Sequence, residues 1–282
     1  MFNSIRSFAL AAFALGVLWF EHKRSLRPIA DSKLKRDVRN LEIAGLAAVA
    51  IQTIEVPVSL AVVRANAKVH RGLLQIVPIP DGAKPLIAIL LLDYTLYIWH
   101  RLTHRVPLLW RFHRVHHIDR EMDASTALRF HFGEITLSVA FRAAQIRLIG
   151  PSFDMYATWQ MLLIMCILFH HSNIRLPLDW ERRLATVLVT PRLHAIHHSV
   201  DDQEVNSNWS SGLTIWDWLH GTLHTKVPQD SIVLGIKGFR GDGDQELGNL
   251  LVHPFVCPAD VPIMSGKTMR DRPNELYDSR RA

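Results

Sequence analysis

The amino-acid sequence predicts an all-α, polytopic membrane protein with four or five transmembrane or re-entrant helices and a cytoplasmic helical cap. Three observations predict this fold class. Charge-poor apolar stretches recur along a chain of 282 residues that is 49% hydrophobic and 21% charged, which is too polar for a bundle buried wholly in lipid and too apolar for a disordered chain. A glycine-proline turn separates two of these stretches. Ten of the 16 histidines fall in three short segments, at 100–117, 170–171 and 194–198.

The first apolar stretch, residues 8–20 (FALAAFALGVLWF), carries no charge. A secretory signal peptide would also be apolar here, but it would end at a cleavage site of small residues. Trp19, Phe20 and Glu21 stand where that site would be, so we expect an uncleaved membrane anchor. The second stretch, residues 41–63, contains two acidic residues and is interrupted by Pro57.

Three more apolar stretches follow. Residues 86–99 continue as a helix into polar sequence, whereas residues 132–149 and 153–169 flank Gly150-Pro151, a strong turn signal. These last two predict a helical hairpin whose arms have roughly the length needed to cross ~30 Å of hydrocarbon. Three polar residues weaken the first arm as a span and leave a re-entrant or interfacial hairpin open: Arg142, Gln145 and Arg147. Residues 176–188 have the pattern of an amphipathic helix at the membrane interface.

Charge predicts how these segments are oriented. Seven lysines and arginines lie in the twenty residues 21–40, and by the positive-inside rule this loop is cytoplasmic. Counting spans from there places every histidine segment on the cytoplasmic face. The basic excess does not indicate nucleic-acid binding, because it lies between apolar spans and no helix-turn-helix or aromatic-basic pattern accompanies it.

The histidines form three boxes with helical spacing. HRLTH places His100 and His104 at i and i+4 on one helix face. HRVHH and HAIHH each place three histidines at i, i+3 and i+4. These are His113, His116 and His117 in one box and His194, His197 and His198 in the other. Neutral imidazole is the commonest protein ligand for zinc, iron and copper, so the boxes predict a histidine-rich dimetal site in the cap, since one zinc takes only about four ligands.

The boxes also limit the chemistry. The HExxH motif of zinc metalloproteases is absent. The first box reads HRLTH and has no glutamate to act as the general base. The Glu-x-x-His pairs of soluble di-iron proteins are also missing. Zinc has no redox chemistry and would support only hydrolysis, whereas two histidine-ligated irons could use oxygen to attack an unactivated C–H bond.

HRLTH, HRVHH and HAIHH, with FHHSNIRLP and TPRLHAIHHS around them, resemble the fatty acid hydroxylase/sterol desaturase superfamily of membrane di-iron oxygenases. The resemblance spans about residues 86–225 and includes ALRFHFGEI and LTIWDWLHGT. It implies an integral protein of the bacterial inner membrane or endoplasmic reticulum, two non-haem irons, molecular oxygen as co-substrate, and hydroxylation or desaturation of a lipid. The ligands that it implies are His100, His104, His113, His116, His117, His194, His197 and His198, with His171 as the ninth.

Two carboxylates are candidates for supporting roles. Asp93 lies seven residues before His100, two helical turns along the same face. An acid in a transmembrane helix is a functional candidate, and we expect Asp93 to accept the free N–H of a ligating imidazole; the alternative is a helix-packing bond to Tyr or Trp. Glu134, three residues after His131, is the second candidate. Whether His131 and His170 bind metal stays open.

The location of the boxes predicts the partners. A substrate that reaches cytoplasmic metals from the bilayer must be a lipid, such as a fatty acyl chain, a sterol or a hopanoid. The sequence contains no flavin, haem or iron–sulfur motif, so an external electron donor is expected to dock near the basic loop. A dizinc membrane hydrolase of lipids and a non-catalytic metal-binding protein are the alternatives.

Three segments follow as expected domains. Residues 1–85 form anchor helices and the basic loop, 86–225 the catalytic domain, and 226–282 a cytoplasmic extension with a polar tail.

Overall fold

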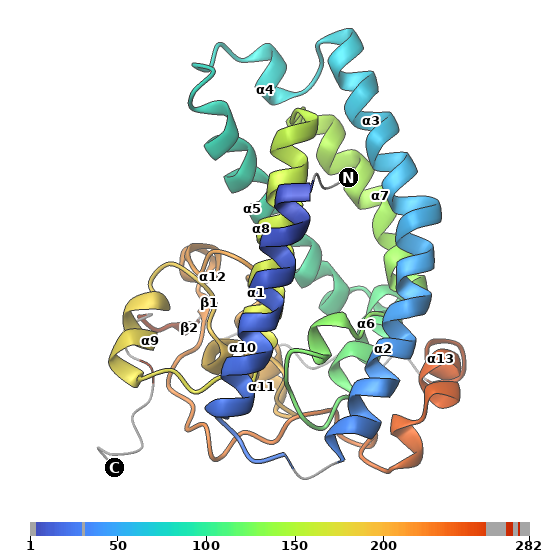
Figure 1. Cartoon of the computed structure of the whole chain (residues 1–282), viewed down its shortest axis with the longest axis vertical. Coiled ribbons are helices and arrows are strands. Elements are labelled where there is room, and N and C mark those ends of the chain that lie inside the picture. The colour runs from blue at the N-terminus through green and yellow to red at the C-terminus, as the bar shows by residue number, and fades with distance from the viewer. Residues whose placement is uncertain (1–3, 30–31, 258–268, 273–275, 277–282) are drawn as a thin grey trace.

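A computed structural model describes residues 4–29, 32–257, 269–272 and 276. Long helices run side by side over a cap of short helices and loops, and the cap lies at the lower end in Figure 1. Four segments are long and apolar enough to cross a membrane: Ser4–Lys23, Lys33–Ile76, Lys84–Arg105 and Phe153–His171. Together with the buried histidines described below, this confirms the predicted fold class.

The first span is α1 (Ser4–Lys23), which packs along α8. The second is longer than the apolar pattern indicated. It contains α2 (Lys33–Ala50), a π-helical turn η1 (Ile51–Glu55), α3 (Val56–Val69) and the short α4 (Leu73–Ile76). The basic segment 21–40 is therefore not wholly a loop, because its last eight residues already belong to α2.

Pro57 does not end the second span. A proline in a helix lacks the N–H that would bond four residues back, and its ring clashes with the carbonyl there. The π-helical turn immediately before it widens the backbone from the i−4 to the i−5 pattern. Because this turn accommodates the proline, α2 and α3 form one continuous rod against α7.

The third span, α5 (Lys84–Arg105), extends from the apolar stretch through the first histidine box, as expected. Val106 is extended, and Pro107 begins α6 (Pro107–His117), which carries the second box. Pro107 is thus at the first turn of a helix, where its missing N–H has no intrahelical partner to lose. A 3₁₀ turn, η2 (Thr126–Leu128), follows in the loop after α6.

The predicted hairpin consists of α7 (Phe132–Ile149) and α8 (Phe153–His171). Gly150 ends α7 with a φ of 73°, a left-handed conformation that suits glycine. Helix α7 is not among the four candidate spans, and its polar side chains bond within the bundle. Arg142 donates to Gln145, whose amide donates to the Leu92 carbonyl 2.8 Å away.

The cap follows α8. Its helices are short: α9 (Leu178–Leu184), α10 (Pro191–His197), α11 (Asp202–Val205), α12 (Ile215–His220), the 3₁₀ turn η3 (Gly243–Gln245) and α13 (Leu247–Val256). Strands β1 (Thr222–Leu223) and β2 (Met269–Arg270) pair in parallel. The amphipathic helix expected over residues 176–188 is only the seven residues of α9. Most of the expected polar tail lies outside the described residues.

Candidate metal centre

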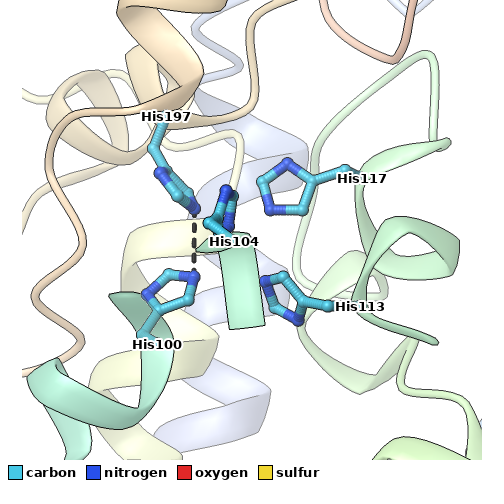
Figure 2. A group of neighbouring side chains, drawn as sticks. All are labelled: His100, His104, His113, His117 and His197. Atoms are coloured by element: carbon cyan, nitrogen blue, oxygen red, sulfur yellow. Dashed lines mark hydrogen bonds between the residues drawn. The ribbon is translucent and has the colours of Figure 1, made fainter. Parts of the chain in front are cut away.

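The nine histidines predicted as ligands gather in two buried groups. The first contains His100, His104, His113, His117 and His197, and Figure 2 shows their rings turned toward a common centre. The second contains His116, His171, His194 and His198. Within each group one ring nitrogen of every histidine lies within 4.8 Å of those of the others. The structure therefore brings together all nine residues and divides them into two sets, each large enough for one metal ion.

Each group draws on helices that are far apart in sequence. The first group takes residues from α5, α6 and α10, and the second from α6, α8 and the segment around α10. Box HRVHH is divided between them, because His113 and His117 are one helical turn apart and His116 projects about 100° away from His117. One helix, α6, thus contributes to both groups and fixes their separation.

The outward nitrogens of several imidazoles bond to backbone carbonyls. Nδ1 of His100 lies 2.6 Å from the Trp209 oxygen, and Nδ1 of His197 lies 2.8 Å from the Ser207 oxygen. Nδ1 of His171 lies 2.9 Å from the Ile167 oxygen. A carbonyl oxygen can only accept, so Nδ1 carries the proton in each ring. In the neutral imidazole Nε2 then presents a lone pair toward the group.

The ring nitrogens that face the centre of the first group lie so close to one another that a cation is needed between or beside them. Nε2 of His197 lies 3.0 Å from Nε2 of His100 (dashed line in Figure 2), although both rings carry their proton on Nδ1. Two lone pairs would face each other at this distance unless a positive ion lay between or beside them. Among the described residues, neither ring nitrogen of His104 or of His117 has a hydrogen-bond partner, and all four are buried. This donor set fits metal ions.

Burial also sets the charge of the histidines on α6 and around α10. It lowers the pKa of His116, His117, His194, His197 and His198 well below 6.5, and the neighbouring imidazoles lower it further. These rings are neutral near pH 7, which is the state in which imidazole binds a metal.

The two candidate carboxylates differ in their partners: Glu134 contacts a histidine, whereas Asp93 contacts the segment around α12. Glu134 Oε1 lies 2.8 Å from Nδ1 of His113, and both side chains are buried. Glu134 thereby orients a predicted ligand. Asp93 does not have the partner that we expected: its Oδ2 accepts from the Trp216 indole at 2.7 Å and from the Leu213 amide at 3.0 Å. The Asp93 carboxylate is turned toward the loop before α12, so among the described contacts it holds that loop rather than an imidazole.

Sequence reasoning missed the loop that supplies the carbonyl acceptors. Asn208 lies between Ser207 and Trp209 with a φ of 52°, and its amide donates to the carbonyls of Leu193 and His224. The left-handed turn at Asn208 lets the carbonyls on either side of it reach two different histidines. Asp217 completes the loop by accepting from the amides of Trp209 and Ser210. The sequence signals for this loop were the Asn type, which tolerates a positive φ, and the motif LTIWDWLHGT, which contains Asp217.

The remaining histidines lie outside both groups. His131 caps α7: its Nδ1 accepts from the Gly133 amide and its Nε2 donates to the Leu251 carbonyl. His170 is buried, with its ring 4.0 Å from that of His194, but it belongs to neither group. His220 stacks on Tyr94 and Tyr97.

A buried ionic network supports the far side of α6. Arg36 of α2 donates to Asp119 at 3.2 Å and to Asp123 at 2.6 Å, and these three side chains are at most 1% exposed. The loop 119–123 follows directly on His116 and His117. Of the seven cations in the basic segment, Arg36 therefore has a structural role in the protein interior.

The known proteins that this chain resembles carry the names of lipid hydroxylases and monooxygenases. Residues 85–222 match the model of the family described as fatty acid hydroxylase. The chain is 31% identical over 162 residues to "Ornithine lipid hydroxylase OlsE" of Rhizobium tropici, a match covering 56% of this chain and 47% of the relative. It is 32% identical over 143 residues to "Alkylglycerol monooxygenase" of Xenopus tropicalis, covering 50% and 30%.

A third relative is "Cholesterol 25-hydroxylase-like protein" of Danio rerio, 34% identical over 140 residues, covering 48% of this chain and 53% of the relative. This chain thus spans about half or less of the length of the curated relatives it matches. No solved structure matches it.

Proposed function

We propose, because residues 85–222 match the model of the fatty acid hydroxylase family, that this protein is an oxygen-dependent di-iron membrane oxidoreductase that hydroxylates or desaturates a lipid C–H bond. The observation that carries the proposal is the pair of buried histidine groups at the ends of membrane-length helices. Two non-haem irons held there would supply the activation of molecular oxygen that such a reaction requires. The five-histidine and four-histidine groups are the proposed ligand sets.

The chain's own residues hold and enclose this centre. The carbonyls of Trp209, Ser207 and Ile167 keep three imidazoles in the tautomer that binds metal. Glu134 does the same for His113. Because all nine histidines are buried, bulk water is kept from the site, which favours oxidation of the lipid over side reactions.

The proposed substrate is a lipid that enters from the bilayer. His100 and His104 lie at the end of α5 and His171 at the end of α8, and both helices are candidate spans. A lipid chain alongside these helices reaches the histidine level without leaving the membrane. The relatives carry the names of enzymes for an ornithine lipid, an alkylglycerol and cholesterol, so we propose a fatty acyl, sterol, hopanoid or related substrate.

We propose that electrons come from an external donor protein with an acidic face. Hydroxylation uses one oxygen molecule, two electrons and two protons per C–H bond, and releases one water. An open cleft of about 1080 Å³ is lined by six arginines and two carboxylates. The arginines are Arg24, Arg27, Arg120, Arg175, Arg192 and Arg240.

The cleft lies close to the second histidine group. Its lining includes Asn173 and Arg192, each two residues from a histidine of that group, His171 and His194. Complementary charge raises the rate at which protein partners associate, so an acidic electron carrier fits this cleft. We place the cleft and the histidines on the cytoplasmic side of a bacterial inner membrane or the endoplasmic reticulum, in keeping with the basic segment 21–40.

The experiment that tests the reaction is reconstitution of the whole chain in liposomes with metal analysis. We expect two irons per chain and, with oxygen and a reductant, a lipid product heavier by one oxygen atom or lighter by two hydrogens. Activity with zinc and without oxygen would instead establish a dizinc lipid hydrolase. The variant His171→Ala is the matched negative control, since it removes one member of the four-histidine group.

The docking of the donor has its own test. Arg24→Glu with Arg175→Glu reverses charge at two exposed positions of the cleft. We expect a higher KM for the donor protein and unchanged turnover with dithionite, which does not need a docking site. Arg183→Glu, an exposed arginine outside the cleft, should change neither.

A further inference from the structure

Helix α12 (Ile215–His220) has an apolar outer face that nothing in the described chain covers. Ile215, Trp218 and Leu219 are 47%, 52% and 59% exposed, and their spacing of i, i+3 and i+4 places them on one side of the helix. We call these three residues the α12 face. Large apolar side chains gathered on one exposed face mark a binding surface for protein or membrane.

The charged residue of α12 and its hydrogen-bonded side chains point the other way. Asp217, its only charged residue, is 1% exposed and accepts from two backbone amides. The Trp216 indole donates to Asp93, and Nε2 of His220 lies 3.1 Å from the Tyr94 hydroxyl. The outer face therefore carries no charge, which distinguishes it from an ordinary solvated helix surface.

The contacts of α12 with α5 show at which level along this membrane-length helix α12 lies. Helix α5 has 22 residues, about 33 Å at ~1.5 Å per residue, close to the ~30 Å of bilayer hydrocarbon. Asp93 and Tyr94, which hold α12, lie near the middle of this helix. Side chains in a helix tilt toward its N-terminus, so both lean away from the histidine end of α5 and into the depth of the membrane.

The neighbouring helices indicate the same level. Helix α1 has 20 residues and α8 has 19, about 30 and 29 Å, and α8 also ends at the histidines. The layer that contains these helices thus reaches down to the histidine level. In Figure 1 α12 lies at the upper edge of the cap, on the side from which the long helices come.

We infer that α12 lies in the cytoplasmic-side leaflet of the bilayer and that the α12 face contacts lipid acyl chains. A membrane, rather than a protein partner, is the occupant because the inner side of α12 is bonded to the middle of a membrane-length helix through Trp216 and His220. Val187, whose carbonyl accepts from the Thr214 amide just ahead of α12, is a further exposed apolar side chain, at 56%.

The inference has a structural consequence for the histidines. The loop that ends in α12 provides the Trp209 carbonyl for His100, so a lipid-embedded helix and a predicted metal ligand belong to one connected segment. The inference itself does not depend on which metal is bound or which reaction occurs.

The test is spin labelling of the full-length chain in liposomes of phosphatidylcholine with phosphatidylglycerol. Cys166→Ala and Cys257→Ser remove the two native thiols, and single cysteines are then introduced at Leu219 and Ile215. Leu15, 68% exposed on α1, serves as the lipid reference and Val233, 47% exposed on the arginine-lined cleft, as the aqueous reference. Collision rates are measured with oxygen, which concentrates in the bilayer, and with a water-soluble nickel chelate.

We expect the labels at Leu219 and Ile215 to behave like the label at Leu15, with frequent oxygen collisions and about a tenfold lower nickel collision rate than at Val233. Both tested side chains are exposed, so the labels do not disturb the packing, and size-exclusion chromatography confirms that each variant stays monodisperse. Nickel collision rates at Leu219 and Ile215 that equal the rate at Val233 would overturn the inference. That result would leave the metal content and turnover of the enzyme untouched, so the proposed function would still stand.

Discussion

Replacing Glu134 with alanine should weaken metal binding in one histidine group and leave the other unchanged. Glu134 Oε1 lies 2.8 Å from Nδ1 of His113, and the two side chains are 8% and 4% exposed. Alanine removes the acceptor and leaves the His113 N–H buried without a partner. His113 belongs to the five-histidine group only, so the effect should be confined to that group.

The magnitude follows from the type of bond that is lost. A hydrogen bond to a charged group contributes ~1.5–3 kcal/mol. Loss of such an acceptor behind a metal-bound imidazole lowers metal affinity about 10–100-fold, equivalent to about 1.4–2.8 kcal/mol. Glu134→Gln keeps a carbonyl oxygen as acceptor and should lose less than about tenfold.

The assay is metal competition with a chelator of known affinity, followed by metal analysis of the protein. Wild-type protein should release its metals in two steps, one for each group. In Glu134→Ala only one step should move to lower chelator concentration. Glu55→Gln is the matched control, because Glu55 is also a buried carboxylate but pairs with Arg142, 3.6 Å away, rather than with a histidine; it should leave both steps in place.

Two results would refute the reasoning. If Glu134→Ala releases metal at the wild-type chelator concentrations, the carboxylate does not orient a ligand. If both steps shift equally in a variant with wild-type melting behaviour, the two groups do not bind metal independently as the geometry indicates.

Three further predictions concern the surroundings of the histidines. Arg36→Met should lower the free energy of unfolding by about 3 kcal/mol or more, measured by chemical denaturation, because it leaves two buried carboxylates without their main partner; a loss below about 1 kcal/mol would contradict this. Burial would raise the pKa of Asp123, but the positive charges of Arg36 and Lys33 hold this pKa below 3.8. The ionised Asp123 therefore stabilises the folded protein fully above about pH 3.8, and this stabilisation is lost as the pH falls through the lower pKa of the folded state. Wild-type stability should therefore fall more steeply below about pH 4 than that of Asp123→Asn, and parallel curves would argue against it. His171→Ala should lose the metal of the four-histidine group, whereas His131→Gln should keep both metals and lose about 1 kcal/mol of stability with its helix cap, as metal analysis and denaturation can establish.

The helices could be predicted from sequence where a local signal marked their ends. The first expected hairpin arm ended at Ile149, as in the structure, because Gly150 adopts the left-handed φ that ends α7. Both arms also began at the expected residues, Phe132 and Phe153. The histidine spacing likewise placed the boxes on helix faces, because helical periodicity is a local property. The division of HRVHH between two groups also follows from this periodicity, but only once the other helices are in place.

The contacts behind the histidines could not be predicted, because they depend on tertiary approach. Every residue has a carbonyl, so nothing in the sequence marks Trp209 and Ser207 as the acceptors for His100 and His197. The expectation for Asp93 used its position on the face of His100, but the loop before α12 approaches that face and takes the carboxylate. Arg36 looked like a loop cation because its partners lie more than eighty residues away.

The contacts around Asn208 make the membrane helices and the cap depend on each other. The carbonyls on either side of Asn208 accept from His100 on a membrane helix and from His197 in the cap. The segment continues into α12, which is held by Asp93, seven residues before His100 on the same helix. The first part of the segment thus bonds to His100 of α5 and to His197 of the cap, and its last part bonds to Asp93 of α5. The five-histidine group can therefore take its observed arrangement only when the cap is docked on α5, so metal binding and docking of the cap must be thermodynamically coupled.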